Sequence, residues 1–207
     1  MLIGVDFDNT IVSYDALFHR LAVEQGHIGP EVPATKEQVR DTMRRAGRED
    51  AWTELQGYVY GARICEASAF PGVKDFFRNC RAAGIDVCIV SHKTKHPFRG
   101  PAYDLHRAAL DWLEHNGFFD PQGIGLPRES VYLRTTLADK LRQIGDNRCA
   151  HFIDDLPELL SEPAFPASVE RWLFDPNEHH PQEARFARAA SWKELDERIL
   201  RVAGSCR

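Results

Sequence analysis

Two carboxylates stand two residues apart near the start of the chain, at the end of a short apolar run. Residues 2–10 read Leu-Ile-Gly-Val-Asp-Phe-Asp-Asn-Thr, so Asp6 and Asp8 follow a run with the length and composition of a buried strand. Carboxylates at this point are expected at an edge of a sheet, because an unpaired charge inside a core would be costly. A strand followed by an Asx turn would account for Asp8 and Asn9, but it would not account for Asp6.

Further polar groups follow the later apolar runs of the chain. Ser91 follows the second run, and Asp154 and Asp155 follow the fourth. Lys140 lies in the first turn of a helix that we expect after the third run. A surface lysine is the ordinary alternative, but a cation there opposes the helix dipole, and a nearby phosphate or group of carboxylates would reverse that effect.

Strand-like and helix-like patterns alternate five times along the chain. The expected strands are residues 2–5, 87–90, 130–133, 151–153 and 171–174. The expected helices are residues 73–83, 102–116, 137–145 and 192–203, with a further short helix that begins at Pro157. Because this alternation is typical of doubly wound α/β proteins, we predict a Rossmann-like parallel sheet. Right-handed crossovers would bring the carboxyl ends of the strands to one edge, where ligands bind.

Residues 14–68 have a different pattern, in which helices follow one another without strands. Three amphipathic helices are expected there, and Thr35 with Gln38 forms a capping box at the start of the second. We therefore predict an α/β core domain of residues 1–13 and 69–207 that carries a small α-helical insertion of residues 14–68.

The composition limits the classes of function. A formal net charge of −5, from 26 basic and 31 acidic side chains, argues against a general nucleic-acid binder, although a local basic pocket would still accept a small phosphorylated substrate. Five scattered cysteines without a Cys-x-x-Cys pair indicate reduced thiols in a cytoplasmic protein. The sequence shows no signal peptide and no apolar stretch long enough to span a membrane, so no membrane partner is expected. The oligomeric state is left open.

Taken together, these motifs resemble those of the haloacid dehalogenase-like (HAD) hydrolase superfamily, over essentially the whole chain. The resemblance rests, in chain order, on Asp6, Asp8 and Thr10, then on Ser91, Lys140 and the pair Asp154 and Asp155. It implies an HAD-like fold in which the helical insertion is a C1-type cap that closes over the site and sets the choice of substrate. Cap residues that could bind an anionic or sugar-like leaving group, or equally form a solvated basic face over a core, are Arg44, Arg45, Arg48, Trp52, Tyr58, Tyr60 and Arg63.

The resemblance also implies the roles of the acidic residues. Asp6 would attack phosphorus and form an aspartyl-phosphate, while Asp8 would protonate the leaving oxygen and later activate water. Mg²⁺ would be held by Asp6, by Asp154 and by the backbone carbonyl of Asp8, because hard oxygen ligands suit this ion. Asp155 would form hydrogen bonds to these ligands or bind the ion through water, and it could also cap the next helix.

The remaining site residues would contact the phosphoryl group or border it. Ser91 would donate a hydrogen bond to a phosphoryl oxygen, and Lys140 would offset charge on the phosphoryl group and on Asp6. Lys93 is a second cation at this point of the chain, and we expect it to contact the phosphate or the leaving group. Thr10 and His92 would border the site, and the loop from Lys93 to Pro101 has no assigned role.

The function that the resemblance favours is a Mg²⁺-dependent phosphatase acting on a small phosphorylated metabolite. A dehalogenase is disfavoured because Asp8 is present as a second acid. A phosphomutase or another phosphotransferase would use similar residues, whereas a polynucleotide 3′-phosphatase is disfavoured by the net acidic charge. A binding or regulatory protein on the same scaffold would be expected to lack Asp6 or Lys140, and both are present.

Overall fold

The computed structural model describes residues 1–181, 183 and 185–200. The chain forms two compact units, which are treated separately below. The first comprises Met1–Ile11, Ala69–His92 and the described residues from Gly117 on, and the second comprises Val12–Ser68 and Lys93–Asn116. In the described part of the chain no helix has the length and apolar character needed to cross a membrane.

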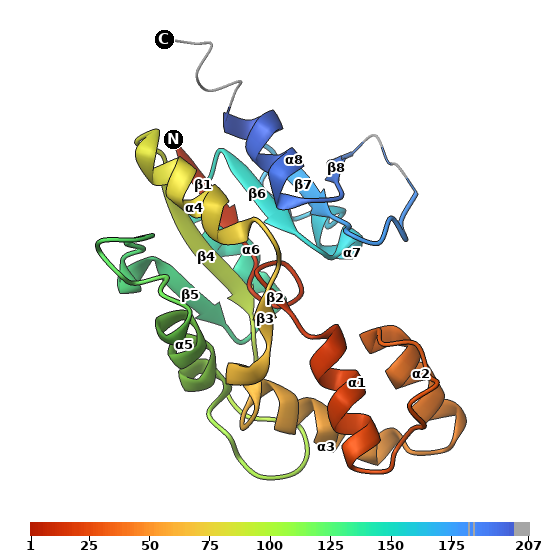
Figure 1. Ribbon diagram of the computed structural model, residues 1–207. Coiled ribbons are helices and arrows are strands. Elements are labelled where there is room, and N and C mark those ends of the chain that lie inside the picture. Colours follow the sequence, from red (N-terminus) through yellow and green to blue (C-terminus); the bar gives the residue numbers. More distant parts are fainter. Residues whose placement is uncertain (182, 184, 201–207) are drawn as a thin grey trace. The chain divides into compact units, whose positions relative to one another are not determined.

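A six-stranded parallel sheet is the centre of the first unit, as the alternation of strands and helices predicts (Figure 1). Its strand order is β5-β4-β1-β6-β7-β8. The strands are β1 (Leu2–Val5), β4 (Asp86–His92), β5 (Val131–Arg134), β6 (His151–Asp154), β7 (Glu170–Phe174) and β8 (Ala187–Ala189). Val5 lies opposite both Ile89 and Ile153, so β1 is enclosed by β4 and β6 and its carboxyl end is at the middle of the sheet edge.

Helices cover both faces of this sheet, which makes the fold a doubly wound α/β fold. Figure 1 shows α4 (Val73–Ala82) and α8 (Trp192–Leu195) in front of the sheet and α6 (Leu137–Asp146) behind it. The apolar cluster behind the sheet combines side chains of α6 with side chains of α7 (Pro157–Leu160) and of alternate strand positions. In front, the ring of Trp192 packs against Phe76 and Phe174, at centroid distances of 5.1 and 5.5 Å.

Local signals in the sequence explain where several helices begin. The hydroxyl oxygen of Thr136 accepts a hydrogen bond of 3.1 Å from the backbone N–H of Asp139, so Thr136 caps the start of α6. Pro157 is in the first turn of α7, as predicted. The expected helix 192–203 is divided into α8 and a π-helical segment, η3 (Asp196–Leu200), and residues 201–203 lie outside the described part.

The second unit is helical and contains α1 (Asp15–Glu24), α2 (Lys36–Arg45), α3 (Glu49–Tyr60), the 3-10 helix η1 (Ile64–Glu66) and α5 (Leu105–His115). Thr35 caps α2 as predicted, since its hydroxyl accepts a 3.2 Å hydrogen bond from the backbone N–H of Gln38. We expected α5 in the core domain, but its contacts group it with this unit, and the indole N–H of Trp112 donates to the carbonyl oxygen of Ala67 at 2.9 Å.

One further short pairing lies outside the six-stranded sheet. β2 (Val12–Ser13) and β3 (Ser68–Ala69) form a separate two-stranded sheet. Neither this pairing nor β8 was expected, because the three segments are too short to show a strand pattern.

Candidate active site

Asp6 continues β1 and lies at the carboxyl edge of the sheet. Its backbone N–H donates to the carbonyl oxygen of Ile153 at 2.9 Å, and its side chain is almost fully buried. The chain then turns sharply, because Asn9 has a left-handed backbone with φ of 57° and the N–H of Ile11 donates to the carbonyl oxygen of Phe7 at 3.0 Å. Asparagine tolerates this conformation better than most residues, so the turn after Asp8 has a local cause in the sequence.

Lys140 contacts acidic residues at the carboxyl ends of two neighbouring strands, β1 and β6. Its ammonium nitrogen Nζ donates to Oδ1 of Asp6 and to Oδ2 of Asp154, each at 2.6 Å. All three side chains are buried, and Oδ1 of Asp154 also accepts a hydrogen bond of 2.9 Å from the backbone N–H of Leu156. Short bonds between ionised groups are among the strongest hydrogen bonds in proteins, so Lys140 fixes the separation of the two carboxylates.

The charges of this group perturb one another strongly. Burial raises the pKa of Asp6 from 3.8 to about 7 against the opposing effect of Lys140, and Asp154 and Asp8 raise it further. Burial disfavours the charged form of Lys140, but Asp154 and Asp6 outweigh this effect and raise its pKa above the ordinary value. Lys140 therefore remains a cation at neutral pH, while Asp6 is poised to gain or lose a proton there.

Three carboxylates of this unit are close enough to share a cation. Asp6, Asp154 and Asp155 each offer an oxygen atom, and these atoms all lie within 4.8 Å of one another. Asp155 accepts a hydrogen bond of 3.3 Å from the hydroxyl of Thr10, which is itself buried. A set of hard oxygen donors fits Mg²⁺, so these residues suit the ion that the motifs imply. The side chain of Asp8 is not part of this cluster.

Ser91 reaches the same edge from β4. Ile89 is the partner of Val5, and Ser91 lies two residues further along, opposite Leu133 and fully buried. His92 follows at the surface, and its Nε2 lies 3.2 Å from the carbonyl oxygen of Thr135. The structure thus brings Asp6, Ser91, Lys140 and the Asp154–Asp155 pair to one edge of one unit, whereas Lys93 belongs to the second unit.

Two structural features of this region could not be predicted from the sequence, namely the burial of Lys140 and a contact of Trp192. A lysine in the first turn of a helix gives no sign that it is buried between two carboxylates. The indole N–H of Trp192 donates to the carbonyl oxygen of Thr10 at 3.1 Å, although Trp192 reads only as an apolar residue of the last helix. Asp175, which follows β7, accepts hydrogen bonds from the backbone N–H groups of His179 and His180, both at 3.0 Å.

Comparisons with known proteins give the fold but no close relative. No family model and no curated protein matches the sequence. Among solved structures, an HAD family hydrolase from Deinococcus radiodurans with bound phosphate and sodium has a TM-score of 0.58 at 19% identity, and the match covers 98% of this chain and 96% of that one. YfnB from Bacillus subtilis, an HAD protein bound to magnesium, has a TM-score of 0.59 at 14% identity, covering 95% and 96%. A protein from Haemophilus somnus described as a predicted phosphoglycolate phosphatase has a TM-score of 0.55 at 16% identity, covering 98% and 97%.

These matches span nearly the whole length of each chain, and they agree with the α/β fold described above. The fold of this chain is that of the haloacid dehalogenase-like hydrolases, as its motifs indicate.

Proposed function

We propose that the protein is a Mg²⁺-dependent phosphatase that hydrolyses a small phosphorylated metabolite through an aspartyl-phosphate on Asp6. The observation that carries this proposal is the buried Lys140 ammonium, held at 2.6 Å from both Asp6 and Asp154 beside the third carboxylate of Asp155. The bound phosphate and magnesium of two proteins with this fold are consistent with it.

The chemistry proceeds in two displacements at phosphorus. A carboxylate oxygen of Asp6 attacks the phosphoryl group and the ester P–O bond breaks, while Asp8 gives its proton to the leaving alkoxide. Water then attacks the aspartyl-phosphate, Asp8 takes a proton from it, and the bond between phosphorus and Asp6 breaks to release phosphate. The first displacement leaves Asp6 bound to phosphorus and Asp8 without its proton. The second displacement restores both, so one turnover leaves both carboxyl groups unchanged.

Positive charge near phosphorus would stabilise the transition states of both displacements. Lys140 keeps its proton and lies against the attacking carboxylate, where it favours the ionised form of Asp6 and offsets charge that develops on the phosphoryl oxygens. Mg²⁺ held by Asp6, Asp154 and Asp155 would supply further positive charge at the same place. Ser91 would donate a hydrogen bond to a phosphoryl oxygen from the end of β4.

The test is phosphate release by purified protein from a broad panel of phosphate esters, with and without Mg²⁺. We expect at least one ester to be hydrolysed, EDTA to stop the reaction, and added Mg²⁺ to restore it. Asp6→Asn should abolish turnover, since an amide cannot act as the nucleophile, while Asp86→Asn is a matched control because Asp86 is exposed at the other end of the sheet. Full activity in EDTA would refute the metal assignment, and an active Asp6→Asn protein would refute the nucleophile.

The panel also separates the proposal from its alternatives. Transfer of the phosphoryl group to an added alcohol or sugar, with little free phosphate, would identify a phosphotransferase that uses the same residues. Ligand binding without any turnover would identify a binding protein on this fold.

A further inference from the structure

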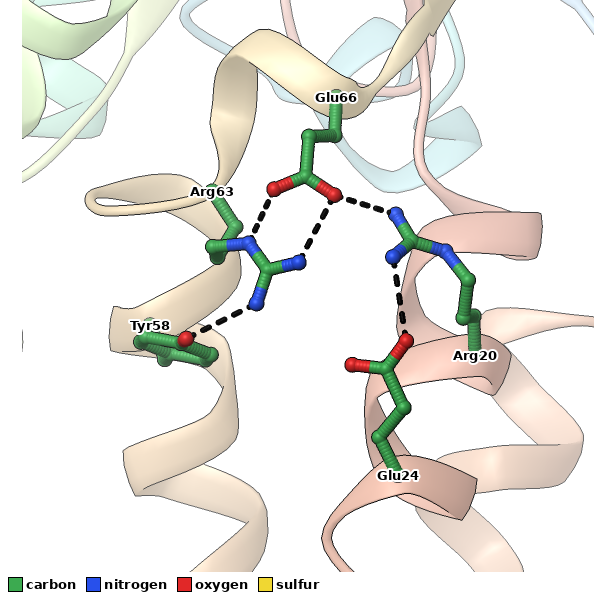
Figure 2. Close-up of polar contacts among 5 residues, drawn as sticks. All are labelled: Arg20, Glu24, Tyr58, Arg63 and Glu66. Carbon is green, nitrogen blue, oxygen red and sulfur yellow. Dashed lines mark hydrogen bonds and ion pairs between the residues drawn. The ribbon is translucent and has the colours of Figure 1, made fainter.

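The arginines of the helical unit contact acidic and backbone groups of the same unit. Figure 2 shows Arg63 between Glu66 and the hydroxyl oxygen of Tyr58. Arg20 lies between the same Glu66 and Glu24, at 2.6 and 3.2 Å. Carboxylates or backbone carbonyl groups are also bound by Arg44, Arg45 and Arg48. These contacts give the arginines of the helical unit a structural role.

Arg134 of the α/β unit makes a different kind of contact, because its partner is a neutral amide. Nε and Nη2 of Arg134 both donate to Oε1 of Gln143. Nε2 of Gln143 in turn donates to Oδ1 of Asn147 at 2.7 Å, and Nδ2 of Asn147 donates to Sγ of Cys88 at 3.4 Å. Four side chains therefore form a chain of hydrogen bonds that ends at the sulfur atom of a buried cysteine.

The direction of these hydrogen bonds is set by the arginine. A guanidinium group has donors and no acceptor, so the amide oxygen of Gln143 must face Arg134. The amide nitrogen of Gln143 then donates to Asn147, and the amide nitrogen of Asn147 is left facing the sulfur of Cys88. Hydrogen bonds in series polarise one another, so the positive charge of Arg134 favours a negative charge on this sulfur.

A second sulfur atom lies beside that of Cys88. Sγ of Cys149 is 3.9 Å away, although the two residues are 61 positions apart in the chain. Both side chains are free thiols, and both are buried in the apolar cluster behind the sheet. Gly4, the partner of Cys88 on β1, leaves space for this contact, because a Cβ atom on Gly4 would lie 3.0 Å from Sγ of Cys149. The fold therefore brings together two thiols that show no pairing motif in the sequence.

The two thiols differ in how easily they ionise. The pKa of Cys88 is lowered, because hydrogen bonds from Cys149 and Asn147 outweigh the effect of burial. The contact with Cys88 and burial both raise the pKa of Cys149. Burial also raises the pKa of Cys80, which lies on α4 in front of the sheet, to about 12. Cys88 is thus the most easily ionised of these three thiols, and the thiolate is the form of cysteine that attacks an oxidant.

The turn before β6 allows the two sulfur atoms to come closer. The bond length of a disulfide is about 2.05 Å, so the sulfur atoms must approach by about 1.9 Å from their separation of 3.9 Å. Cys88 is inside β4, whereas Cys149 follows a turn in which Arg148 is exposed and has a left-handed backbone with φ of 53°. Surface backbone outside regular structure moves more readily than a strand inside a sheet, so we expect Cys149 to make most of this movement.

We propose that Cys88 and Cys149 are a modification site for peroxides, at which two-electron oxidation forms a reversible disulfide within the α/β unit. The thiolate of Cys88 attacks one oxygen atom of hydrogen peroxide, the O–O bond breaks, and hydroxide leaves and is protonated to water. Cys88 is then a sulfenic acid. The sulfur of Cys149 attacks the sulfenic sulfur, and the sulfenic hydroxyl leaves as water with the proton of Cys149.

The overall change is balanced, because two thiols lose two electrons and one peroxide molecule is reduced to two molecules of water. Exchange with a thiol reductant reverses the oxidation. The inference concerns the α/β unit alone and does not depend on the proposed phosphatase function.

Mass spectrometry of the folded, full-length protein provides the test. Cys65 is exposed and Cys206 lies outside the described residues, so both are replaced by serine, which leaves Cys80, Cys88 and Cys149. Hydrogen peroxide should remove two hydrogen atoms from the mass, peptide mapping should find Cys88 joined to Cys149, and dithiothreitol should restore both thiols. Retention of the free thiols, addition of oxygen to single cysteines, or a bond between any other pair would refute the proposal.

Single substitutions in this background test the order of the two steps. Cys149→Ala removes the second thiol and should leave a sulfenic acid on Cys88, which dimedone captures. Cys80→Ala removes a buried thiol of the same unit and should leave formation of the disulfide unchanged. Circular dichroism establishes that each variant is folded. Absence of dimedone from Cys88 in a folded Cys149→Ala protein would refute Cys88 as the attacking sulfur.

Gln143→Glu tests the chain of hydrogen bonds that positions Asn147. An ionised carboxylate still pairs with Arg134 but cannot donate, so the amide of Asn147 turns over and presents its oxygen to Cys88. Disulfide formation at pH 7 should slow by about threefold to tenfold, because a higher thiol pKa lowers the thiolate fraction and only partly raises its nucleophilicity. The pH at which the rate is half-maximal should rise. Arg142→Gln changes the net charge equally at an exposed position of α6 and should change neither quantity, whereas an unchanged rate and pH profile in Gln143→Glu would refute the role of this chain.

Urea unfolding shows whether the bond fits the folded unit. A cross-link between residues 61 positions apart restricts the unfolded chain, so the oxidised protein should unfold at a higher urea concentration than the reduced protein. Peroxide-treated Cys149→Ala, which cannot form the bond, should show no such rise. A midpoint that does not rise on oxidation of the parent protein would refute a disulfide that forms within the folded α/β unit.

Discussion

The raised pKa of Asp6 predicts that the proposed nucleophile destabilises the metal-free protein. The folded state holds a proton on Asp6 up to about pH 7, whereas the unfolded chain loses it near pH 3.8. Stability is therefore fully present at low pH and is lost as the pH rises through the folded pKa, because the unfolded state then binds fewer protons than the folded state. Asp6→Asn removes this titration and should remove the loss.

The magnitude follows from the same difference. Each pH unit between the two pKa values changes the free energy of unfolding by about 1.4 kcal/mol, so the wild-type protein should lose roughly 3 kcal/mol relative to Asp6→Asn between pH 5 and pH 7. Above about pH 8 the difference should become constant. The Asp6→Asn protein should consequently gain stability over the wild type as the pH rises, and lose activity, as is common where a site keeps costly charges for catalysis.

The assay is urea unfolding followed by circular dichroism from pH 5 to pH 9, at constant ionic strength and with EDTA present. EDTA is needed because a bound cation would favour the ionised carboxylate. Asp86→Asn, an exposed substitution of the same kind in the same unit, should give a curve parallel to the wild type. Parallel curves for Asp6→Asn and the wild type would refute the argument that burial controls the ionisation of Asp6.

Two further outcomes follow from the helix that carries the buried ammonium. Lys140→Met should lower the free energy of unfolding at pH 8 by about 3–5 kcal/mol, because it leaves Asp6 and Asp154 buried without their cation. The measurement is urea unfolding in EDTA, and a loss below about 1 kcal/mol would contradict this expectation. Thr136→Ala should cost about 1 kcal/mol in the same assay, since Asp139 loses its capping partner, and Thr135→Ala is the control because Thr135 is the neighbouring residue outside the cap.

Most of the sheet could be predicted, because five of its strands can be recognised from the amino acids within each strand. Each of the five expected strands is an apolar run of the kind found in strands covered on both faces, and the helices between them begin at recognisable caps such as Thr136. β8, which reads Ala-Arg-Ala, could not be predicted, because its only strand property is its pairing with β7. Short edge strands depend on the sheet beside them rather than on their own composition.

The sequence allowed candidate site residues to be named, but it did not allow their geometry to be predicted. Strand ends and the resemblance to the HAD hydrolases were enough to select Asp6, Lys140 and Asp154, yet the burial of Lys140 depends on partners that are 134 and 14 residues away. The arginines of the helical unit were named as possible substrate contacts because they cluster in the sequence. The sequence gives no information on the carboxylates and carbonyl groups to which Arg44, Arg48 and Arg63 donate hydrogen bonds. Likewise, the apolar face of α5 shows that it packs against something without showing which unit it joins.

The order in which the chain is synthesised gives the long-range contacts of the site a further meaning. β1 is made first, but it lies at the centre of the sheet and its two neighbours come much later. At about 5–20 residues per second, the 134 residues from Asp6 to Lys140 take roughly 7–27 s to synthesise. The contact of Trp192 with the carbonyl oxygen of Thr10 spans 182 residues, so it forms only after residue 192 has left the ribosome. The acidic residues at the end of β1 are therefore synthesised well before Lys140, and the contact of α8 with Thr10 forms later still.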